Sequence, residues 1–379
     1  MNFQLTEEQL SIQQMARAFA EAELAPIAAD LDKTGRFPGE VIAKMAEIGF
    51  MGVNVPEAYG GADLDAVCKV LIISELAKQC ASTAEVLSVH TVASDILKKF
   101  GTEAQKKKYL TAAASGKIGA FALTEPGAGS DAASAKTKAV SDGDNYVING
   151  TKCFISNMGP DEGDFVVLIA LTDPSKGVGG MSAILVDRGT PGFSVGKTED
   201  KMGIRAASVS ELIFEDCRVP KSNLLGAENL GFKIAMIGLD GGRIGMAAQA
   251  LGICDAAIAA SVTYMKQRVQ FGKPIAALQG LQWYIADMAT RTEASRALIM
   301  EAADTYDRGL PVSKLASMAK YYASENAVWV TNKALQIHGG YGYMRDYPIE
   351  RMYRDARIIP LYEGTSEIQK LVISREVMK

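Results

Sequence analysis

Residues 123–131, LTEPGAGSD, decide what kind of fold occupies the middle of this chain. Gly127 and Gly129, with Ala132, match the loose dinucleotide-binding pattern G-x-G-x-x-[GA]. That pattern indicates a Rossmann fold only when a strand precedes it and a long helix begins at it. Here Thr-Glu-Pro, residues 124–126, precedes the glycines and β-rich sequence follows them. The context therefore argues against a Rossmann fold, and taken alone the stretch is interpreted as a glycine-rich turn between strands.

The same turn also has a functional interpretation. Its small residues leave backbone N–H groups uncovered, and Thr124 and Ser130 place two hydroxyl groups beside them. This combination can contact the edge of a polar heterocycle or a phosphate. The turn is therefore a candidate binding loop as well as a structural one.

Around this loop, from Gly119 to about Pro220, the sequence is typical of short β-strands. Turn signals rich in Gly, Pro and Asp separate runs that are rich in β-branched and aromatic residues. The predicted strands are residues 146–149, 165–171, 181–186, 192–195 and 209–214. We predict a compact antiparallel β domain over residues 120–226.

Helical patterns come before this domain, over residues 1–119. Thr6 and Gln9 have the spacing of a capping box and predict where the first helix begins. Further helices are predicted over residues 70–79 and 84–100. The basic run at residues 106–108 is interpreted as a solvated helix face rather than an anion site.

Long helical patterns return after the β domain, over residues 227–379. The clearest predict helices over 243–267, 281–307 and 312–338, so Arg243 begins the first of them and Arg268 ends it. The plan is helical, then β, then helical, which predicts a mixed α and β fold with three domains.

Composition excludes several classes of protein. The chain has 379 residues, 48% of them hydrophobic, which is enough for more than one core and too apolar for disorder. A net charge of −4 gives no basic surface, so no nucleic-acid partner is expected. No run of about eighteen uncharged apolar residues appears, so we expect no membrane insertion and a cytoplasmic location.

No metal site is expected either. Two histidines stand alone, and five cysteines lie far apart with no CxxC pair, which also fits a reducing compartment. These residues are His90 and His338, and Cys68, Cys80, Cys153, Cys217 and Cys254.

Glu363 is the candidate catalytic residue. Ser366 and Gln369 have the spacing of a capping box, which predicts that the last helix begins there and leaves Glu363 just outside its positive end. One interpretation is a carboxylate that complements the helix dipole. The other is a general base, because apolar neighbours at residues 358–361 would desolvate the carboxylate and raise its pKa.

Two further segments are candidate binding sites. Residues 267–274, QRVQFGKP, combine a helix-terminal arginine with a tight turn, and a guanidinium pairs well with phosphate. Residues 336–343, QIHGGYGY, end another helix with clustered glycines, for which a helix C-cap is the simpler account. His338 there is expected to pack rather than to ligate.

In this order and at these separations, the motifs resemble those of the acyl-CoA dehydrogenase family over essentially the whole chain. They are residues 123–131, 154–157 (FISN), 268–274, 336–340 and 362–368 (YEGTSEI). The resemblance implies an N-terminal helical domain, a middle antiparallel β domain and a C-terminal four-helix-bundle domain, assembled as a homotetramer that binds FAD.

The resemblance also assigns roles to single residues. It places Phe121, Leu123, Thr124, Gly129, Ser130, Phe154, Ile155 and Ser156 around the flavin, and Thr365 and Glu367 against FAD at the start of the last helix. It places Arg268, Gln270, Phe271, Gln336, Ile337, Gly339 and Gly340 against the FAD of a neighbouring subunit, and Gln279 among the cofactor-binding residues. Ser130, Asp240, Arg243 and Gly364 match positions that contact the CoA thioester substrate. The family often has Trp and Thr where this chain has Phe154 and Ser156, so flavin stacking and redox tuning can differ here.

Glu363 matches the family's catalytic base. One branch of the family carries its base instead at the position of Gly242, and glycine cannot accept a proton. The implied reaction removes the α-proton of an acyl-CoA while flavin takes the β-hydride, and the backbone N–H of Glu363 and an FAD hydroxyl stabilise the thioester oxygen. Electrons would pass to an electron-transferring flavoprotein.

The sequence leaves alternatives open for the acyl group of the substrate and for the direction of the reaction. Residues 239–252 and 88–91 look most like those of short-chain, butyryl-CoA-type members, and no arginine at residues 82–94 suits a second carboxylate. The reverse reaction, as an enoyl-CoA or aryl-propenoyl-CoA reductase, is one alternative. An oxidase that uses oxygen is another, and a non-catalytic scaffold is disfavoured because the motifs are retained together.

Overall fold

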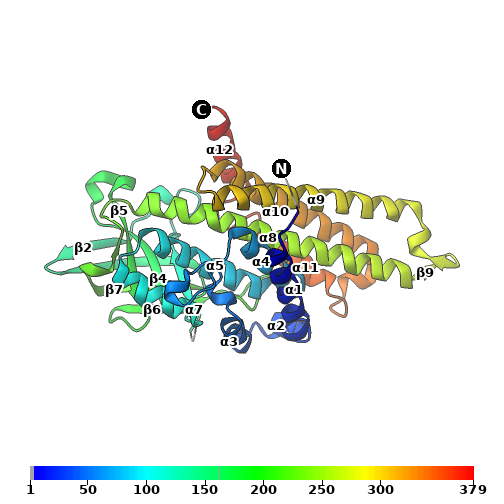
Figure 1. Cartoon of the computed structure of the whole chain (residues 1–379), viewed down its shortest axis with the longest axis horizontal. Coiled ribbons are helices and arrows are strands. Elements are labelled where there is room, and N and C mark those ends of the chain that lie inside the picture. The colour runs from blue at the N-terminus through cyan, green and yellow to red at the C-terminus, as the bar shows by residue number, and fades with distance from the viewer. Residues whose placement is uncertain (1–3, 161) are drawn as a thin grey trace.

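The molecule is elongated, with a β-sheet at one end, long helices toward the other end and one long helix that runs between the two ends (Figure 1). The computed structural model describes residues 4–160 and 162–379. The N-terminal helices lie along the middle of the molecule, and the last helix projects from its side (Figure 1).

The N-terminal part of the chain is helical. Its helices are α1 Glu7–Phe19, α2 Ala28–Thr34, α3 Gly39–Glu47, α4 Ala66–Gln79, α5 Ala81–Phe100, α6 Glu103–Gln105 and α7 Thr111–Ala114. The predicted capping box is confirmed, because Thr6 Oγ1 accepts from the Gln9 N–H and the Gln9 side chain accepts from the Thr6 N–H. Lys107 and Lys108 are exposed, which confirms the solvated face.

Helix α5 is buried along almost its entire length, from Ala81 to Leu97. It lies between α8 (Gly231–Gln267) and strand β1 (Gly119–Ala122). A buried helix must satisfy its polar side chains internally. Ser94 Oγ donates to the carbonyl of His90 at 3.1 Å, and Asp95 accepts from Lys69 Nζ at 3.0 Å. Any polar group of α5 that lacks such a partner therefore requires an explanation.

The middle of the chain forms an eight-stranded sheet. Its strands are β1, β2 Lys138–Asp142, β3 Asn145–Ser156, β4 Phe165–Leu171, β5 Met181–Asp187, β6 Phe193–Thr198, β7 Val209–Pro220 and β8 Leu224–Leu225. The order is β6-β7-β3-β2-β4-β5-β8, and β1 pairs with β4. The predicted β domain is thus confirmed, and β1, β2 and β8 are additional to the five predicted strands.

The sheet is antiparallel except at two places. Strand β1 pairs with β4 in parallel, from Gly119 opposite Phe165 to Ala122 opposite Leu168, and β2 meets β4 in parallel at one pair. Parallel neighbours require a long connection. The chain supplies it by running through the 123–131 loop and the β2–β3 hairpin before β4 begins. The expectation of an antiparallel domain was therefore wrong at the β1–β4 and β2–β4 pairs.

The C-terminal part is again helical. It contains α8, the hairpin strands β9 Val269–Gln270 and β10 Lys273–Pro274, and the helices α9 Gln279–Asp307, α10 Ser313–His338, α11 Ile349–Ala356 and α12 Ser366–Val377. Helices α8, α9 and α10 pack together and α12 packs on α10.

Helix α8 begins at Gly231, so the prediction that Arg243 opens it was wrong. Glycines weaken the helical signal in this segment, but tertiary packing requires several of them. A β-carbon at Gly245 would lie 2.2 Å from Ser88 Oγ, and one at Gly252 would lie 2.2 Å from the carbonyl oxygen of Ser74. These glycines let α4 and α5 approach α8 closely, and Arg243 lies inside the helix with only 5% of its surface exposed.

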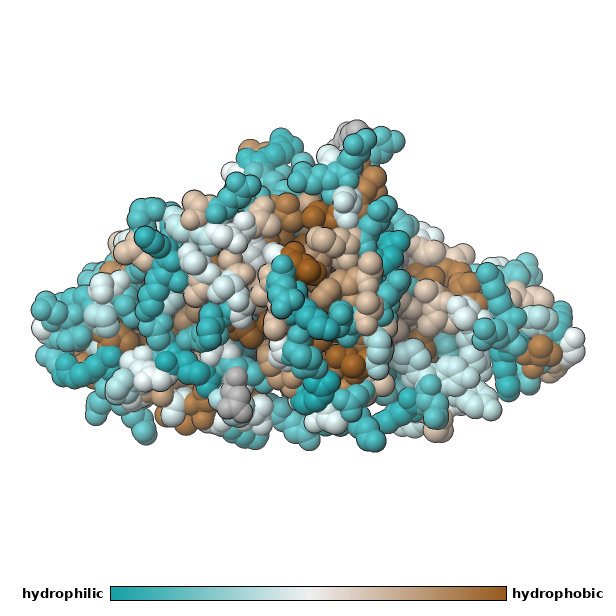
Figure 2. Space-filling view, turned by 60° about the horizontal axis from the view of Figure 1, so that its bottom comes forward, coloured by the Kyte–Doolittle hydropathy of each residue, from teal (hydrophilic) through white to brown (hydrophobic). Residues whose placement is uncertain are grey.

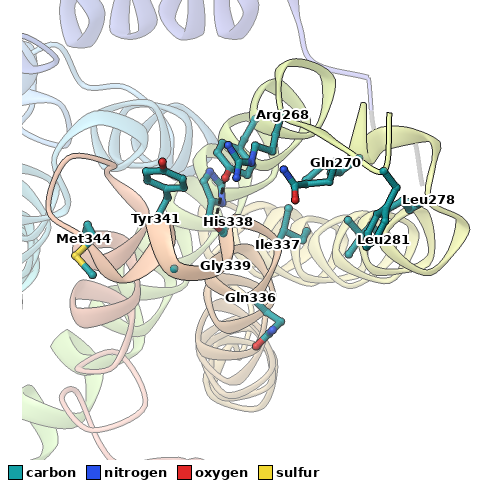
Figure 3. A pocket seen from close by; sticks show the side chains of 14 residues that line it. Arg268, Gln270, Leu278, Leu281, Gln336, Ile337, His338, Gly339, Tyr341 and Met344 are labelled. Carbon is teal, nitrogen blue, oxygen red and sulfur yellow. Dashed lines mark hydrogen bonds between the residues drawn. The ribbon is translucent and has the colours of Figure 1, made fainter. Parts of the chain in front are cut away.

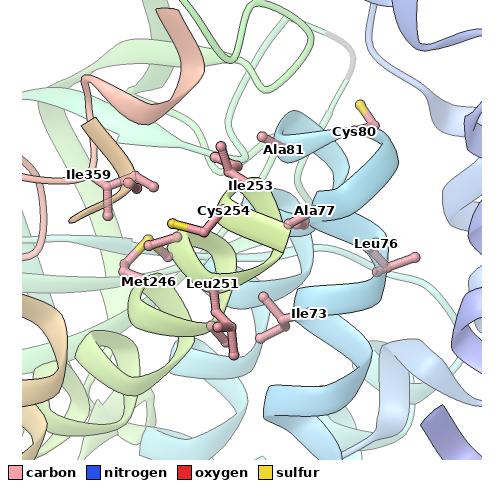
Figure 4. Close-up of a cluster of buried hydrophobic side chains, with 14 of the residues drawn as sticks. Ile73, Leu76, Ala77, Cys80, Ala81, Met246, Leu251, Ile253, Cys254 and Ile359 are labelled. Atoms are coloured by element: carbon pink, nitrogen blue, oxygen red, sulfur yellow. The ribbon is translucent and has the colours of Figure 1, made fainter. Parts of the chain in front are cut away.

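Burial explains the apolar character of α8. By length and composition α8 contains a stretch that could cross a membrane, but 72% of that stretch is buried inside the fold, as in the core helix of a globular protein. Figure 4 shows part of this core, in which Leu251 of α8 lies beside Ile73 of α4 and Ile253 lies near Ala81, while the sulfur of Cys254 points away from α4.

The outer surface is mainly hydrophilic on the face drawn in Figure 2, with hydrophobic residues gathered near its middle. Exposed large side chains also cluster in sequence around the β9–β10 hairpin and after α10. Phe271 is 88% exposed and Tyr343 is 76% exposed.

Candidate functional site

Glu363 lies in the loop between α11 and α12, on a turn that is held from two sides. Its backbone is in the left-handed region with φ +55°, and Gly364 follows with φ +91°. Gln369 Nε2 donates to the carbonyl oxygens of Glu363 and Gly364 at 3.0 and 2.8 Å. Lys320 Nζ from α10 donates to the Gly364 carbonyl at 2.7 Å. Such strained positions persist where the surroundings fix them, and they concentrate at functional sites.

The predicted capping box at Ser366 and Gln369 was wrong. Thr365 is the N-cap, and its hydroxyl oxygen accepts from the Ile368 N–H at 3.3 Å. Ser366 Oγ donates instead to Glu325. The Gln369 side chain donates to the carbonyls of Glu363 and Gly364, so it does not form the reciprocal bond of a capping box.

The carboxyl group of Glu363 is desolvated, as its apolar surroundings predicted. The residue as a whole is half-buried, but Oε2 has no solvent contact and no hydrogen-bond partner in the described structure. Burial raises the pKa of Glu363 to about 7, although the positive charges of Arg243 and Lys320 act in the opposite direction. A carboxylate with that pKa is suited to exchange a proton near neutral pH.

Gly242 of α8 forms one wall against this carboxyl group. A β-carbon at position 242 would lie 2.7 Å from Glu363 Oε2, 3.0 Å from its Cδ and 3.0 Å from Val92 Cγ2 of α5. Any larger side chain would have to displace Glu363. Gly242 cannot itself act as a base, and its lack of a side chain leaves room for the carboxyl group of Glu363.

Arg243 and Asp240 stand beside this wall. Arg243 Nη1 donates to Asp240 Oδ1 at 2.8 Å, and Ser313 Oγ of α10 donates to Asp240 Oδ2. Among the residues that the structure describes, Arg243 Nε is buried without a hydrogen-bond partner. Burial raises the pKa of Asp240, while its bonds to Ser313 and Arg243 lower it. The structure thus brings three of the predicted residues, Arg243, Glu363 and Gly364, around Lys320.

Sequence reasoning missed Lys320. It is completely buried on α10, and burial lowers its pKa to about 8. Buried alanines surround it in sequence at Ala316, Ala319 and Ala323. A lysine on the apolar face of an alanine-rich helix was the signal that could have identified it.

Sequence reasoning also missed Glu85. It lies on α5 and is 1% exposed, and Ser156 Oγ donates to its Oε1 at 2.7 Å. Burial raises the pKa of Glu85 to about 7, and the charge of Glu363 adds to that rise. A single acid in the otherwise uncharged run of residues 80–94 was the available signal.

The loop at residues 123–131 is anchored by a buried ion pair. Lys152 Nζ lies 2.8 Å from Glu125 Oε1 and also donates to the Leu123 carbonyl at 2.8 Å. The carbonyl of Thr124 accepts from the Cys153 N–H at 3.0 Å, so the loop lies beside the end of β3. Glu125 pairs with Ala128 in a single bridge, which confirms a turn and not a Rossmann motif.

The predicted flavin-contacting residues differ in exposure. Leu123 and Ile155 are buried, Phe121, Thr124 and Ser156 are half-buried, and Gly129 and Ser130 are exposed. Phe154 is 65% exposed and has a left-handed backbone with φ +57°. A β-carbon at Gly127 or Gly129 would meet no atom within 4 Å. The loop and the end of β3 thus present an open surface with an exposed aromatic ring.

Seven of the other predicted cofactor residues meet in a cavity of about 560 Å³ near the β9–β10 hairpin. Its lining includes Arg268, Gln270, Phe271, Gln336, Ile337, Gly339 and Gly340. Figure 3 shows Arg268 and Gln270 above Ile337, while the Gln336 side chain points away from Arg268. The Arg268 guanidinium lies 5.3 Å from the Tyr341 ring centre, and β-carbons at Gly339 or Gly340 would meet no atom within 4 Å. This open, singly charged pocket suits an anionic group such as a phosphate.

Three predicted residues lie elsewhere. Gln279 is exposed at the start of α9 and does not line the cavity, although its neighbour Leu278 does. Thr365 caps α12, and exposed Glu367 lines a second cavity of about 340 Å³ with Arg357.

Both histidines pack inside the fold. His338 Nδ1 bonds to the Ala334 carbonyl at 2.8 Å and its ring stacks on Tyr264. Burial lowers the pKa of His90 to about 4. Over residues 4–160 and 162–379, no group of three or more His, Cys, Asp or Glu residues could hold a metal ion.

Comparison with known proteins covers the whole chain. Models of the N-terminal, middle and C-terminal domains of acyl-CoA dehydrogenase match residues 6–117, 120–217 and 229–378. The chain is 57% identical over 382 residues to the acryloyl-CoA reductase (NADH) of Anaerotignum propionicum, covering 100% of this chain and 96% of that protein. It is 50% identical over 381 residues to the short-chain specific acyl-CoA dehydrogenase of Clostridium acetobutylicum, covering all of both.

Two solved structures have nearly the same fold. Butyryl-CoA dehydrogenase from Megasphaera elsdenii superposes with a TM-score of 0.98 at 44% identity, over all of both chains. A chain from a structural study of the electron transferring flavoprotein of Acidaminococcus fermentans also gives 0.98, at 50% identity over all of both chains.

Proposed function

The chain belongs to the acyl-CoA dehydrogenase family of flavoprotein oxidoreductases, and from that premise we propose that it interconverts a short-chain acyl-CoA and its trans-2-enoyl-CoA with Glu363 as the base. The observation that carries this proposal is the Glu363 carboxyl group, which is desolvated against Gly242 and has a pKa of about 7.

FAD is the cofactor that this proposal requires, and the residues present fit it. The loop at 123–131 has open glycine positions beside the exposed ring of Phe154, and the hairpin cavity holds Arg268 beside uncovered backbone. When bound, FAD supplies the acceptor or donor of the hydride. Phe121, Thr124, Ser130, Phe154 and Ser156 would hold the flavin end.

The chain's own residues manage the proton. Glu363 Oε2 has no hydrogen-bond partner over residues 4–160 and 162–379, so it is free to take the α-proton of the thioester or to return one. The Glu363 N–H donates no hydrogen bond within the described structure, which leaves it available for the thioester oxygen. One such donor is typically worth a few kcal/mol to an enolate-like transition state. Arg243 and Lys320 keep the carboxyl group partly ionised.

Partners are proposed on the same basis. The hairpin cavity would hold the FAD of a neighbouring copy within a homotetramer, because its residues lie on a different part of the chain from Glu363 and are largely exposed. An electron-transferring flavoprotein is the proposed electron partner, supported by the likeness to the chain from Acidaminococcus fermentans. A cytoplasmic location remains part of this proposal.

Reduction of an enoyl-CoA is the second candidate direction. It is favoured by the 57% identity to a protein named as an acryloyl-CoA reductase. The same proton transfer then runs backwards, with Glu363 protonated at the start.

The test is an anaerobic titration of the purified flavoprotein with butyryl-CoA and with crotonyl-CoA. Butyryl-CoA should bleach the oxidised flavin, and crotonyl-CoA should restore the colour of the reduced protein. Glu363→Gln should bind FAD and show no bleaching. A Glu363→Gln variant that bleaches at the wild-type rate would remove the base assignment, and peroxide formation during turnover in air would indicate an oxidase.

A further inference from the structure

One buried acid is not used by the proton transfer described above. Glu85 is 1% exposed, and only one of its oxygens is occupied, by the hydroxyl of Ser156. Its second oxygen, Oε2, is buried and has no hydrogen-bond partner in the described part of the chain. One turn further along α5, Ser88 Oγ is also buried without a partner within the described residues. An unpaired buried polar atom is costly, so two of them one turn apart indicate a place that a ligand completes.

The position of this pair relates it to the reacting end of the site. Glu85, Ser88 and Val92 share one face of α5, at spacings of three and four residues. Val92 closes the wall around Gly242 and Glu363, and Ser88 Oγ lies where a β-carbon of Gly245 would be 2.2 Å away. The charge of Glu363 raises the pKa of Glu85, so the two carboxyl groups lie within electrostatic reach. The pair therefore lies on the face of α5 that also forms the wall beside Glu363.

The charges around Glu85 limit which chemical group of a ligand could bind there. A second carboxylate on the acyl chain would face Glu85 and Glu363 together, which like charges disfavour. An ammonium group would share the region with Lys201, whose positive charge also acts on Glu85. A methyl group would leave Glu85 Oε2 unpaired. A hydroxyl group is neutral, and it can donate to an ionised Glu85 or accept from a protonated one.

We propose that Glu85, together with Ser88, forms a subsite for a hydroxyl group on the acyl chain and so selects hydroxylated short-chain acyl-CoA thioesters over their methyl analogues. This inference rests on the proposed function, because it presumes that an acyl group enters beside Glu363. It adds a substrate class to that function.

The experiment compares thioesters of equal length that differ only in the last group. The pairs are 4-hydroxybutyryl-CoA with pentanoyl-CoA and 5-hydroxypentanoyl-CoA with hexanoyl-CoA, which cover two depths. The measured quantity is the ratio of kcat/KM for the hydroxyl compound to that for the methyl compound. Wild-type protein should favour the hydroxyl compound in at least one pair, and Glu85→Leu should lower that ratio about tenfold or more, since a lost buried hydrogen bond commonly has that effect.

Controls separate this result from general damage. Ser94→Ala alters a buried hydroxyl on the same helix that is already bonded to its own backbone, and it should leave the ratio unchanged. Glu85→Ala is the second variant if the leucine does not fold, since alanine suits a helix. Binding of the non-reacting thioether analogues, measured by calorimetry, should show the same change in ratio without chemistry.

The outcomes are distinct. A wild-type preference for the methyl compound in both pairs, or a ratio that neither Glu85 variant changes, would overturn the subsite. Failure of butyryl-CoA to bleach the wild-type flavin would instead overturn the proposed function, whatever Glu85 does.

Discussion

Replacing Gly242 with alanine is expected to slow proton abstraction with little change in stability. The new β-carbon would lie 2.7 Å from Glu363 Oε2 and 3.0 Å from Val92 Cγ2, both closer than ordinary contact. Relief requires Glu363 to move by roughly half an ångström, and a misplacement of about 1 Å can cost about 100-fold in rate. We therefore expect the reduction of the flavin by butyryl-CoA to slow by roughly 10- to 100-fold.

The stability terms for this variant nearly cancel. Alanine is favoured over glycine inside a helix by about 1 kcal/mol, and overpacking costs about 1–3 kcal/mol. Stopped-flow measurement of flavin bleaching gives the rate, and denaturant unfolding gives the stability. Gly39→Ala, at the start of α3 with only an ordinary contact to Phe37, is the matched control and should keep the wild-type rate. A Gly242→Ala variant that bleaches as fast as wild type would refute the argument that this glycine positions the base.

Three further predictions follow from buried charges. Lys320→Met removes a positive charge that lowers the pKa of Glu363, so the acidic limb of the rate against pH should move to higher pH; an unmoved limb would contradict the role of Lys320. Lys152→Met leaves Glu125 buried without its ion-pair partner and should lower the free energy of unfolding by about 3–5 kcal/mol. The double variant Lys152→Met/Glu125→Gln should recover part of this lost stability, and urea unfolding measures both. Burial raises the pKa of Glu363 from 4.5 to about 7, so between these pH values the native state holds a proton that the unfolded state releases. The free energy of unfolding should therefore fall as pH rises from about 4.5 to 7. In unfolding experiments at pH 5 and 7, Glu363→Gln should show a smaller fall than the wild type.

Hydrogen bonds and packing explain why the site tolerates a strained backbone at Glu363. The turn places its carboxyl group within the electrostatic influence of Arg243 and Lys320, and Gln369 and Lys320 donate to its backbone carbonyls. The strained conformation costs about 1–3 kcal/mol and persists because these bonds and the packing of α8 determine it. Alteration of Gln369 would therefore be expected to loosen the base rather than to change its pKa directly.

Local features of this chain could be predicted from sequence because their causes are local. The capping box of Thr6 and Gln9 involves residues three apart, and strand β4 occupies the predicted residues 165–171. The turn at 123–131 was separated from a Rossmann motif by its immediate neighbours. The desolvation of Glu363 was predicted from the apolar residues before it in sequence, but Leu361 is 47% exposed and Gly242 of α8 forms the wall against the carboxyl group. The family followed from motifs spread over the whole chain.

Tertiary contacts decided the rest, because their partners lie far apart in sequence. Arg243 lies inside α8 rather than at its start because α4 and α5 pack on the glycines that weaken the helical signal. Strand β1 is parallel to β4 because the chain crosses the sheet between them. Gly242 faces Glu363, Lys320 reaches Gly364 and Glu85 meets Ser156 only after folding, so no sequence pattern near any one of them could reveal its neighbour.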